Sequence, residues 1–201
     1  MMTITYPART GIYVNMTNRC PCACTFCLRN NKDHVFDSDS LWLDREPTIQ
    51  EVCDSIDTWD LTKYEEIVFC GYGEPTERLH DLLEVAKYIK SKSDIKIRIN
   101  TNGLADLICN ESTAPKLKGL IDTVSISLNA TDKDEYLKVV RPKFGIKSYD
   151  AMLKFAKECT EYVPSVIMTV VDVVTSKEEQ EACRKICESV GATLRIRPYE
   201  D

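Results

Sequence analysis

Strand-like and helix-like segments alternate along the whole chain, and this alternation limits the fold more than any other feature. Several strand-like segments, such as residues 67–69 and 166–171, are nearly continuous runs of apolar residues. Such runs are typical of parallel strands that are buried on both faces under helices. The pattern therefore predicts an α/β fold built on a parallel sheet.

Six strands and about five helical crossovers are expected. The strand-like segments are residues 11–17, 66–70, 95–100, 123–128, 165–171 and 193–197. Helix-like periodicity covers residues 48–59, 77–92, 105–120, 132–139, 148–162 and 177–190. Parallel strands joined by helices in this number predict a partial, open (β/α)6 barrel of the TIM type. At a length of 201 residues, we expect one domain over residues 1–201.

Three cysteines, Cys20, Cys24 and Cys27, follow the first expected strand with the spacing Cys-x-x-x-Cys-x-x-Cys. A cubane of four irons and four sulfides is normally held by four cysteine thiolates. Three thiolates leave one iron open, and an open iron can bind and activate a small molecule. The loop over residues 18–30 therefore predicts a [4Fe-4S] site that takes part in chemistry.

Zinc is the alternative metal for this loop. Cys22 lies between the first two ligands, and tetrahedral zinc sites also use close cysteine pairs. A compact site of four thiolates usually has two separated pairs, however, and no second Cys-x-x-Cys pair follows downstream. We therefore favour the iron–sulfur interpretation, in which Cys22 is a bystander.

The chain resembles the radical S-adenosylmethionine (SAM) superfamily in the segment NMTNRCPCACTFC, residues 15–27, which includes the aromatic Phe26 before the third cysteine. The resemblance implies that the open iron binds the amino and carboxylate groups of SAM. It also implies reductive cleavage of SAM to methionine and a 5′-deoxyadenosyl radical that abstracts hydrogen from a substrate, here unidentified. An electron donor such as flavodoxin or ferredoxin would then be required.

Within the superfamily, the Asn-Met-Thr-Asn-Arg-Cys-Pro opening, the Phe-Cys-Leu-Arg-Asn ending at Asn30 and the short length look like the TatD-associated radical SAM proteins. That resemblance implies a functional link to a TatD-type hydrolase and names no substrate. A glycyl-radical-enzyme activase, or an enzyme that rearranges a small substrate such as a pterin, is the alternative within enzymology. A non-catalytic zinc or iron–sulfur electron-transfer protein is the alternative of another class.

A Gly-Tyr-Gly-Glu-Pro motif follows the second expected strand. It is similar to the Gly-Gly-Glu motif of the superfamily, which implies that Gly71, Gly73 and Glu74 contact the amino group of SAM. Glycine permits close backbone approach, and a carboxylate can accept hydrogen bonds from an ammonium group. Tyr72 departs from the family pattern and leaves open which glycine supplies the contact. A plain strand-to-helix turn is the alternative.

Polar residues end the next two strands. Asn102 suits hydrogen bonding to cofactor or substrate, although the Asn-Gly pair it begins is also common in turns. Strand alternation places Ser125, Ser127 and Asn129 on one side, toward the barrel interior. In similar enzymes this strand contacts the ribose or carboxylate of SAM, which makes Ser127 and Asn129 candidates. Hydrogen bonding between strands is the alternative.

Three arginines are candidates for substrate contact. Arg195 and Arg197 alternate with apolar residues on the last expected strand, and inward-facing guanidinium groups suit an anionic substrate. Salt bridges at the barrel edge are the alternative for this pair. Arg141 lies in a loop and could pair with an anion or simply be solvated.

Composition limits compartment and partners. No secretory signal pattern and no run of eighteen apolar residues occurs, so neither secretion nor a membrane span is expected. The cysteines outside the loop lie on apolar faces, which indicates buried free thiols and a cytoplasmic protein. Cys183 and Cys187 share a helix face, where core packing and a ligand or redox pair both stay open. A net charge of −6 gives no indication of nucleic-acid binding.

Overall fold

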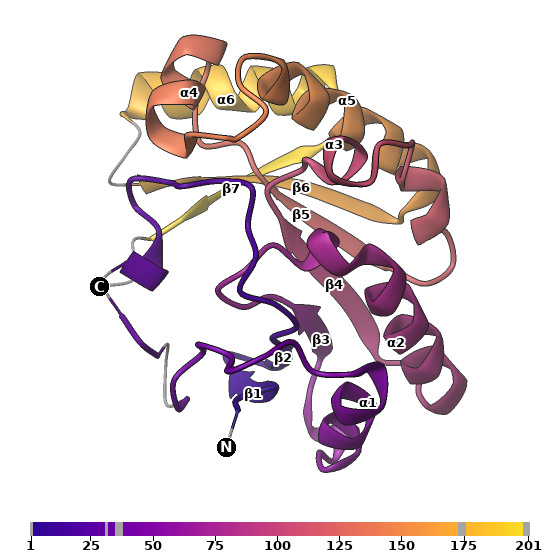
Figure 1. Ribbon diagram of the computed structural model, residues 1–201. Helices are drawn as coiled ribbons and strands as arrows, with labels where there is room; N and C mark the ends of the chain where they lie inside the picture. The colour runs from indigo at the N-terminus through magenta and orange to yellow at the C-terminus, as the bar shows by residue number, and fades with distance from the viewer. Residues whose placement is uncertain (1, 31, 35–37, 173–175, 199–201) are drawn as a thin grey trace.

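A seven-stranded, mostly parallel sheet forms the centre of the protein, and its strands are ordered in space as they are in the chain. A computed structural model describes residues 2–30, 32–34, 38–172 and 176–198. The strands are Thr5–Ala8 (β1), Gly11–Val14 (β2), Glu66–Phe69 (β3), Lys96–Thr101 (β4), Thr123–Ser127 (β5), Ser165–Val171 (β6) and Thr193–Arg197 (β7). Strands β2 to β7 pair in parallel, and the curved sheet does not close (Figure 1). The predicted α/β fold with an open, partial barrel is confirmed.

The six expected strands correspond to β2 to β7, and the structure adds strand β1, which was not predicted. It pairs antiparallel with β2, with Tyr6 opposite Tyr13 and Pro7 opposite Ile12. Arg9 turns the hairpin with a positive φ of 54°. The strand is four residues long and contains a proline, and both features weaken a strand signal in a sequence.

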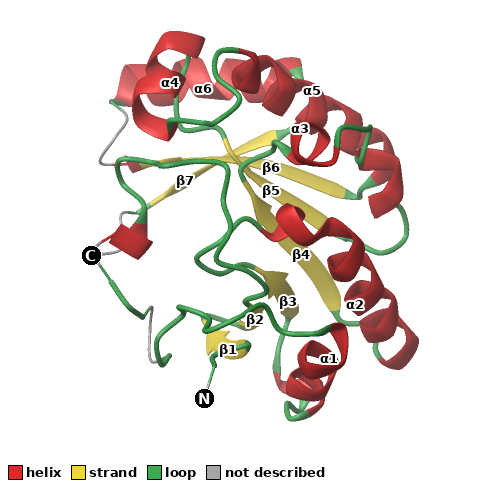
Figure 2. Cartoon of the chain, viewed as in Figure 1, coloured by secondary structure: helices red, strands yellow, loops and turns green. Residues whose placement is uncertain are grey.

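Helices cover the outer face of the sheet, as Figures 1 and 2 show. They are α1 (Ile49–Asp57), α2 (Leu79–Lys92), α3 (Ala105–Cys109), α4 (Lys133–Val140), α5 (Lys147–Tyr162) and α6 (Lys177–Ser189). Within the described ranges, none of these helices has both the length and the apolar character that a bilayer crossing requires. The helices follow the expected segments closely except at residues 105–120.

The expectation of one helix over residues 105–120 was wrong. Helix α3 ends at Cys109 because Asn110 adopts a left-handed conformation, with φ 55°, and caps the helix. Asparagine tolerates this conformation better than most residues. A separate 3₁₀ turn, Ala114–Leu117, then begins with Pro115 in its first turn, where a missing N–H costs nothing.

The two faces of the sheet differ in chemistry. Residues that point toward the helices are apolar and fully buried, as are Ile12, Ile67 and Ile97, which are neighbours across β2, β3 and β4. On the inner face, polar side chains line the cavity, among them Arg98 of β4 and Ser125 of β5. The hydrophobic core therefore lies between the sheet and the helices, and the concave inner face of the sheet borders a polar cavity.

Candidate functional site

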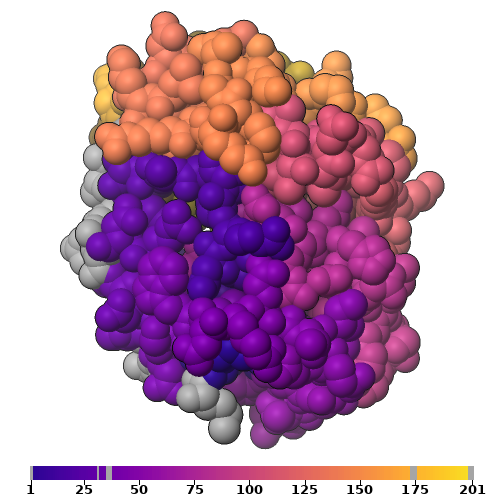
Figure 3. Space-filling view, in the orientation of Figure 1, coloured from indigo at the N-terminus to yellow at the C-terminus, as the bar shows by residue number. Residues whose placement is uncertain are grey.

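A cavity of about 300 Å³ lies inside the curve of the sheet, at the carboxyl ends of its parallel strands. This is the position of active sites in barrels of this type, and the volume is at the lower end of the roughly 300–1,000 Å³ found for ligand pockets. All ten predicted site residues line it: Cys20, Cys24, Phe26, Cys27, Gly71, Gly73, Glu74, Asn102, Ser127 and Asn129. In Figure 3, residues from the N-terminal third of the chain lie across the middle of the face that covers the sheet.

The cysteine loop is fixed by backbone hydrogen bonds to the end of α4. Ala23 N donates to the Val140 carbonyl at 3.1 Å, and Thr25 N donates to the Val139 carbonyl at 2.9 Å. In the same region Cys22 forms an isolated antiparallel bridge with Pro142. The loop is thus tied to an element far away in the sequence, which holds its thiols against the cavity.

The loop thiols differ in their surroundings. Cys20, Cys24 and Cys27 are half-buried, whereas Cys22 is 5% exposed. The Cys22 thiol hydrogen-bonds to the sulfurs of Cys20 and Cys24, which lowers the pKa of both and raises that of Cys22. Its sulfur also accepts a hydrogen bond from Asn102 Nδ2 at 3.6 Å.

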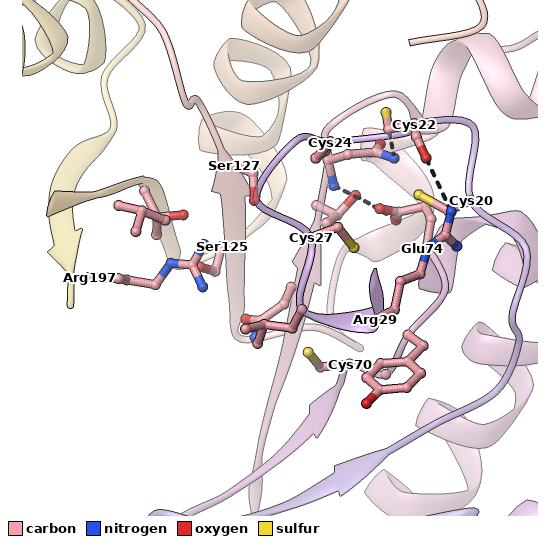
Figure 4. A pocket seen from close by; sticks show the side chains of 18 of the residues that line it. Cys20, Cys22, Cys24, Cys27, Arg29, Cys70, Glu74, Ser125, Ser127 and Arg197 are labelled. Carbon is pink, nitrogen blue, oxygen red and sulfur yellow. Dashed lines mark hydrogen bonds between the residues drawn. The ribbon is translucent and has the colours of Figure 1, made fainter. Parts of the chain in front are cut away.

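The positions of these thiols fit a cluster. Cys20, Cys24 and Cys27 border the cavity, and Figure 4 shows the sulfur of Cys27 on the inner side of the loop, away from that of Cys22. Three thiols spread around a space are the donor set that a cubane with one open iron requires. Their roles as ligands remain predictions.

Two uncharged polar atoms that are buried on the cavity wall lack a partner among the described residues. They are Oδ1 of Asn129, which is 5% exposed, and the hydroxyl of Tyr136, which is fully buried. Burial raises the pKa of Tyr136, so this hydroxyl remains protonated and can donate. Buried polar groups normally have partners, and both atoms therefore fit a polar ligand such as SAM in this cavity.

Gly71 and Gly73 are required by packing. A Cβ at Gly71 would lie 2.1 Å from Oδ1 of Asn15, and one at Gly73 would lie 2.2 Å from the Thr17 carbonyl oxygen. Neither glycine has a positive φ. The turn after β3 thus presses against the chain that leads into the cysteine loop, and this contact accounts for both glycines whether or not they also contact a cofactor.

Glu74 connects the ends of β3 and β4. Its Oε1 accepts hydrogen bonds from Thr101 Oγ1 at 2.7 Å and from both N and Oγ1 of Thr76, and its Oε2 accepts one from Asn102 N at 2.7 Å. The side chain is 4% exposed, and burial raises its pKa although these donors oppose the shift. The Glu74 carboxylate already accepts four hydrogen bonds within the protein, and the one from Asn102 N positions Asn102 at the cavity.

Where it is described, the segment of residues 28–46 packs onto the sheet. Leu41 is 1% exposed, lines the cavity and lies in an apolar cluster with Tyr13 and Tyr72. The Tyr72 hydroxyl donates to the Lys32 carbonyl. Residues 31 and 35–37 lie outside the described residues.

Outside the cavity, two other candidates are placed in structural roles. Arg141 is exposed, has a φ of 49° and caps the carboxyl end of α4, so the structure does not bring it to the cavity. Cys183 and Cys187 are buried in the core on α6, where burial raises the pKa of both thiols. Core packing therefore describes this pair.

Sequence reasoning missed several cavity residues, among them Arg29, Cys70, Arg98 and Tyr136. Alternation along the third expected strand, which puts Arg98 and Asn100 on one face, was a usable signal for Arg98. Tyr136 offered no such signal, because a tyrosine in an amphipathic helix is ordinary core. It reaches the cavity only through the way α4 packs.

A curved parallel sheet that does not close, with a three-cysteine loop directly after its first parallel strand, defines an enzyme class that binds its cofactors at the carboxyl ends of the strands. The family model described as the radical SAM superfamily matches residues 14–186, and the chain belongs to this superfamily. The superfamily uses a [4Fe-4S] cluster and SAM. No relative among the curated proteins matches the chain.

Solved structures of similar fold include a radical SAM methyltransferase from Sphaerobacter thermophilus, at 19% identity and a TM-score of 0.66 over 96% of this chain and 56% of that one. Streptococcus suis SuiB bound to S-adenosylmethionine has 17% identity and a TM-score of 0.63 over 94% and 38%. The FeFe-hydrogenase maturase HydG from Carboxydothermus hydrogenoformans has 16% identity and a TM-score of 0.67 over 96% and 44%. The chain therefore spans at most 56% of these proteins, and the likeness is one of fold.

Proposed function

We propose that this chain is a radical SAM enzyme in which Cys20, Cys24 and Cys27 hold the [4Fe-4S] cluster. The observation that carries the proposal is that all ten residues singled out by motif line one cavity, although they come from four separate parts of the chain. When bound, the cluster supplies the electron that cleaves SAM to a 5′-deoxyadenosyl radical for hydrogen abstraction.

The chain's own residues prepare the cavity for SAM. Phe26 adds an aromatic ring to its wall, and Gly71 and Gly73 let the backbone after β3 approach closely. Glu74 holds the Asn102 backbone in place. Ser127 and Asn129 offer hydrogen-bonding groups from the end of β5. Oδ1 of Asn129, which has no partner among the described residues, suits a hydroxyl or ammonium donor.

At the level of the whole chain, we propose one radical SAM core domain over residues 1–201, with the cluster loop at residues 18–30. The short cysteine-loop motif supports the TatD-associated subfamily and, through it, a functional link to a TatD-type hydrolase. Reductive cleavage needs an external electron donor such as flavodoxin or ferredoxin. Activation of a glycyl-radical enzyme is the second enzymatic candidate.

The proposal is tested by anaerobic reconstitution with iron and sulfide, reduction, addition of SAM and measurement of 5′-deoxyadenosine. Wild type should form it, and single alanine variants at Cys20, Cys24 and Cys27 should not. Cys22→Ala is the matched control, because it removes a thiol from the same loop. We expect it to keep the cluster and the cleavage activity.

Two outcomes would contradict the proposal in different ways. A fully formed cluster that leaves SAM intact would identify an electron carrier. A cluster that survives alanine at Cys20, Cys24 and Cys27 together would show that other residues hold it. An activase would in addition transfer radical character to a glycine of a partner protein, which electron paramagnetic resonance would detect.

A further inference from the structure

Among the residues that the structure describes, the charged side chains that line the cavity are mostly basic, whereas the chain as a whole is acidic. Overall the sequence has more acidic than basic residues, with 32 Asp and Glu against 26 Lys and Arg. The described residues that line the cavity include five arginines and one carboxylate, Glu74. The arginines are Arg9, Arg29, Arg98, Arg195 and Arg197. A local reversal of this kind requires an explanation in terms of what the cavity binds.

Arg98 has a carboxylate partner. Arg98 is 6% exposed and forms two hydrogen bonds with Glu66, from Nε at 2.9 Å and from Nη2 at 2.6 Å. Its Nη1 donates to Asn100 Oδ1 at 2.8 Å. The Arg98–Glu66 pair has no net charge, so Arg98 forms part of the cavity wall but adds little positive charge to it.

Arg195 is different. Its Nε is buried without an acceptor among the described residues, and its Nη2 reaches only Ser125 Oγ, at 3.4 Å. No described carboxylate lies within ion-pair distance of it. Burial lowers the pKa of Arg195, and the neighbouring guanidinium groups of Arg98 and Arg197 lower it further. A guanidinium in such surroundings is unfavourable unless an anion joins it.

The sheet register places this guanidinium on a specific wall. Arg195 lies opposite Thr169 and Arg197 opposite Val171 in the pairing of β6 with β7. All four residues line the cavity. In Figure 4, Arg197 and Ser125 lie on the other side of the view from Cys20 and Cys27. Arg29, by contrast, donates to the backbone of the cysteine loop, at Asn18 and Cys22.

We propose that the β7 wall of the cavity binds an anionic group of the substrate, a carboxylate or a phosphate, with Arg195 as its main contact. The inference rests on the proposed function and names the substrate class for it. Arginine presents paired N–H donors that match both groups. In the proposed function the carboxylate of SAM binds the open iron on the cysteine side, so an anion at β7 comes from a second molecule.

Binding of two probes tests the proposal on the anaerobically reconstituted protein without SAM. Inorganic phosphate and succinate are titrated by calorimetry at constant ionic strength, which is adjusted with sodium chloride. Wild type should bind one of them, and which one distinguishes a phosphate from a carboxylate substrate. Arg195→Gln should weaken that binding about 10-fold or more, because a charged hydrogen-bonding partner is lost.

Arg184→Gln is the matched control. It removes the same charge from an exposed site on α6, where Arg184 pairs with Glu181 at 3.5 Å, and it should leave anion binding unchanged. Arg195→Lys keeps the positive charge but lacks the paired N–H donors of the guanidinium group. This variant should bind the anion with intermediate affinity. Arg195→Gln should also unfold at a temperature no lower than wild type, because its guanidinium has no carboxylate partner to lose.

Failure can be assigned to one proposal or the other. If wild type binds neither probe, if Arg195→Gln binds as wild type does, or if Arg184→Gln weakens binding equally, the anion site is wrong even when SAM is cleaved. A clear drop in unfolding temperature for Arg195→Gln would show that Arg195 takes part in a structural ion pair. That result would also overturn the proposed anion site. Anion binding through Arg195 in a protein that does not cleave SAM would contradict the proposed function alone.

Discussion

At Gly73, the turn after β3 passes so close to the cysteine loop that no side chain fits between them. A Cβ there would lie 2.2 Å from the Thr17 carbonyl oxygen and 2.7 Å from that of Arg19. Both are backbone atoms, which cannot rotate away as the end of a flexible side chain can. The glycine therefore fixes where the loop begins and, with it, where Cys20 lies.

Gly73→Ala should lower the free energy of unfolding by about 3 kcal/mol, because an overpacked site must displace backbone. It should also lower the iron bound per chain after reconstitution, since the displaced backbone leads into the cysteine loop. Urea unfolding and iron analysis check both results. Gly119→Ala is the control, because nothing lies within 4 Å of its Cβ position and only its φ of +75° is unfavourable.

For Gly119→Ala we expect a loss of about 1 kcal/mol and full iron content. Equal iron content in the two variants would contradict the packing argument. The motif in the sequence made Gly73 a site candidate, and Gly73 lines the cavity. The motif could not show the contact with Thr17, because that contact joins segments far apart in the chain and depends on how β2 and β3 pair.

Between elements, Asp122 joins β4, β5 and α2. Its carboxylate accepts hydrogen bonds from Lys90 Nζ at 2.7 Å and from the backbone N of Ile97 at 2.8 Å. Its own N donates to the Ile97 carbonyl, and its carbonyl accepts from Ser165 N. One residue at the start of β5 thus links the strands on both sides and the end of a helix.

Asp122→Asn should lower the free energy of unfolding at neutral pH by about 2 kcal/mol. Burial alone would raise the pKa of Asp122, but the hydrogen bonds from Lys90 and Ile97 outweigh it and hold the pKa below 3.8. The unfolded chain therefore takes up the proton first as the pH falls. The stabilisation is fully present above pH 3.8 and is lost as the pH falls toward the folded pKa.

Urea unfolding at pH 7 and at pH 3 measures this change. The gap between wild type and Asp122→Asn should narrow at the lower pH. Asp60→Asn is the control, because Asp60 is exposed and asparagine can replace it as the cap of the turn Leu61–Lys63. A gap that stays constant with pH would show that the carboxylate charge does not matter.

Helices and strands were predictable where their periodicity was long, and this explains both the successes and the errors at this scale. The apolar pattern of α5 and α6 runs for several turns, and their bounds agree with the expected segments to within one residue at each end. The break at Asn110 depends on one left-handed residue within an otherwise helical pattern. Local conformation at a single position leaves little trace in periodicity.

At the scale of the whole molecule, hydrogen bonds between the cysteine loop and residues 139–143 connect the first third of the chain with its second half. Ala23 and Thr25 donate to carbonyls at the end of α4, and Lys143 N donates to the Pro21 carbonyl at 2.8 Å. A ligand that orders the loop should therefore also order residues 139–143, because local opening of either segment breaks the same bonds.

Hydrogen exchange with and without the reconstituted cluster tests this coupling. Amides of residues 20–27 and of residues 139–143 should both exchange more slowly in the loaded protein. Amides of α1 should not change, since helix α1 shares none of these bonds. Protection limited to residues 20–27 would show that the loop and α4 open independently.

The cavity as a whole was only partly predictable. The cysteine and glycine motifs identified one wall, because their residue types and spacing are themselves the signal. The arginine wall had a weaker signal, since Arg195 and Arg197 alternate on β7 but nothing in the sequence places them beside Arg98. That proximity follows from the curvature of the sheet, which a one-dimensional pattern does not contain.

The match between spatial order and chain order of the strands has a consequence for how the protein is made. Each new strand can pair with the one before it as the chain leaves the ribosome, so the sheet grows in one direction. The cysteines emerge early, whereas the wall that faces them exists only after β7 has paired. Metal that is loaded onto a nascent chain would therefore meet an exposed cysteine loop before the β7 wall of the cavity is in place.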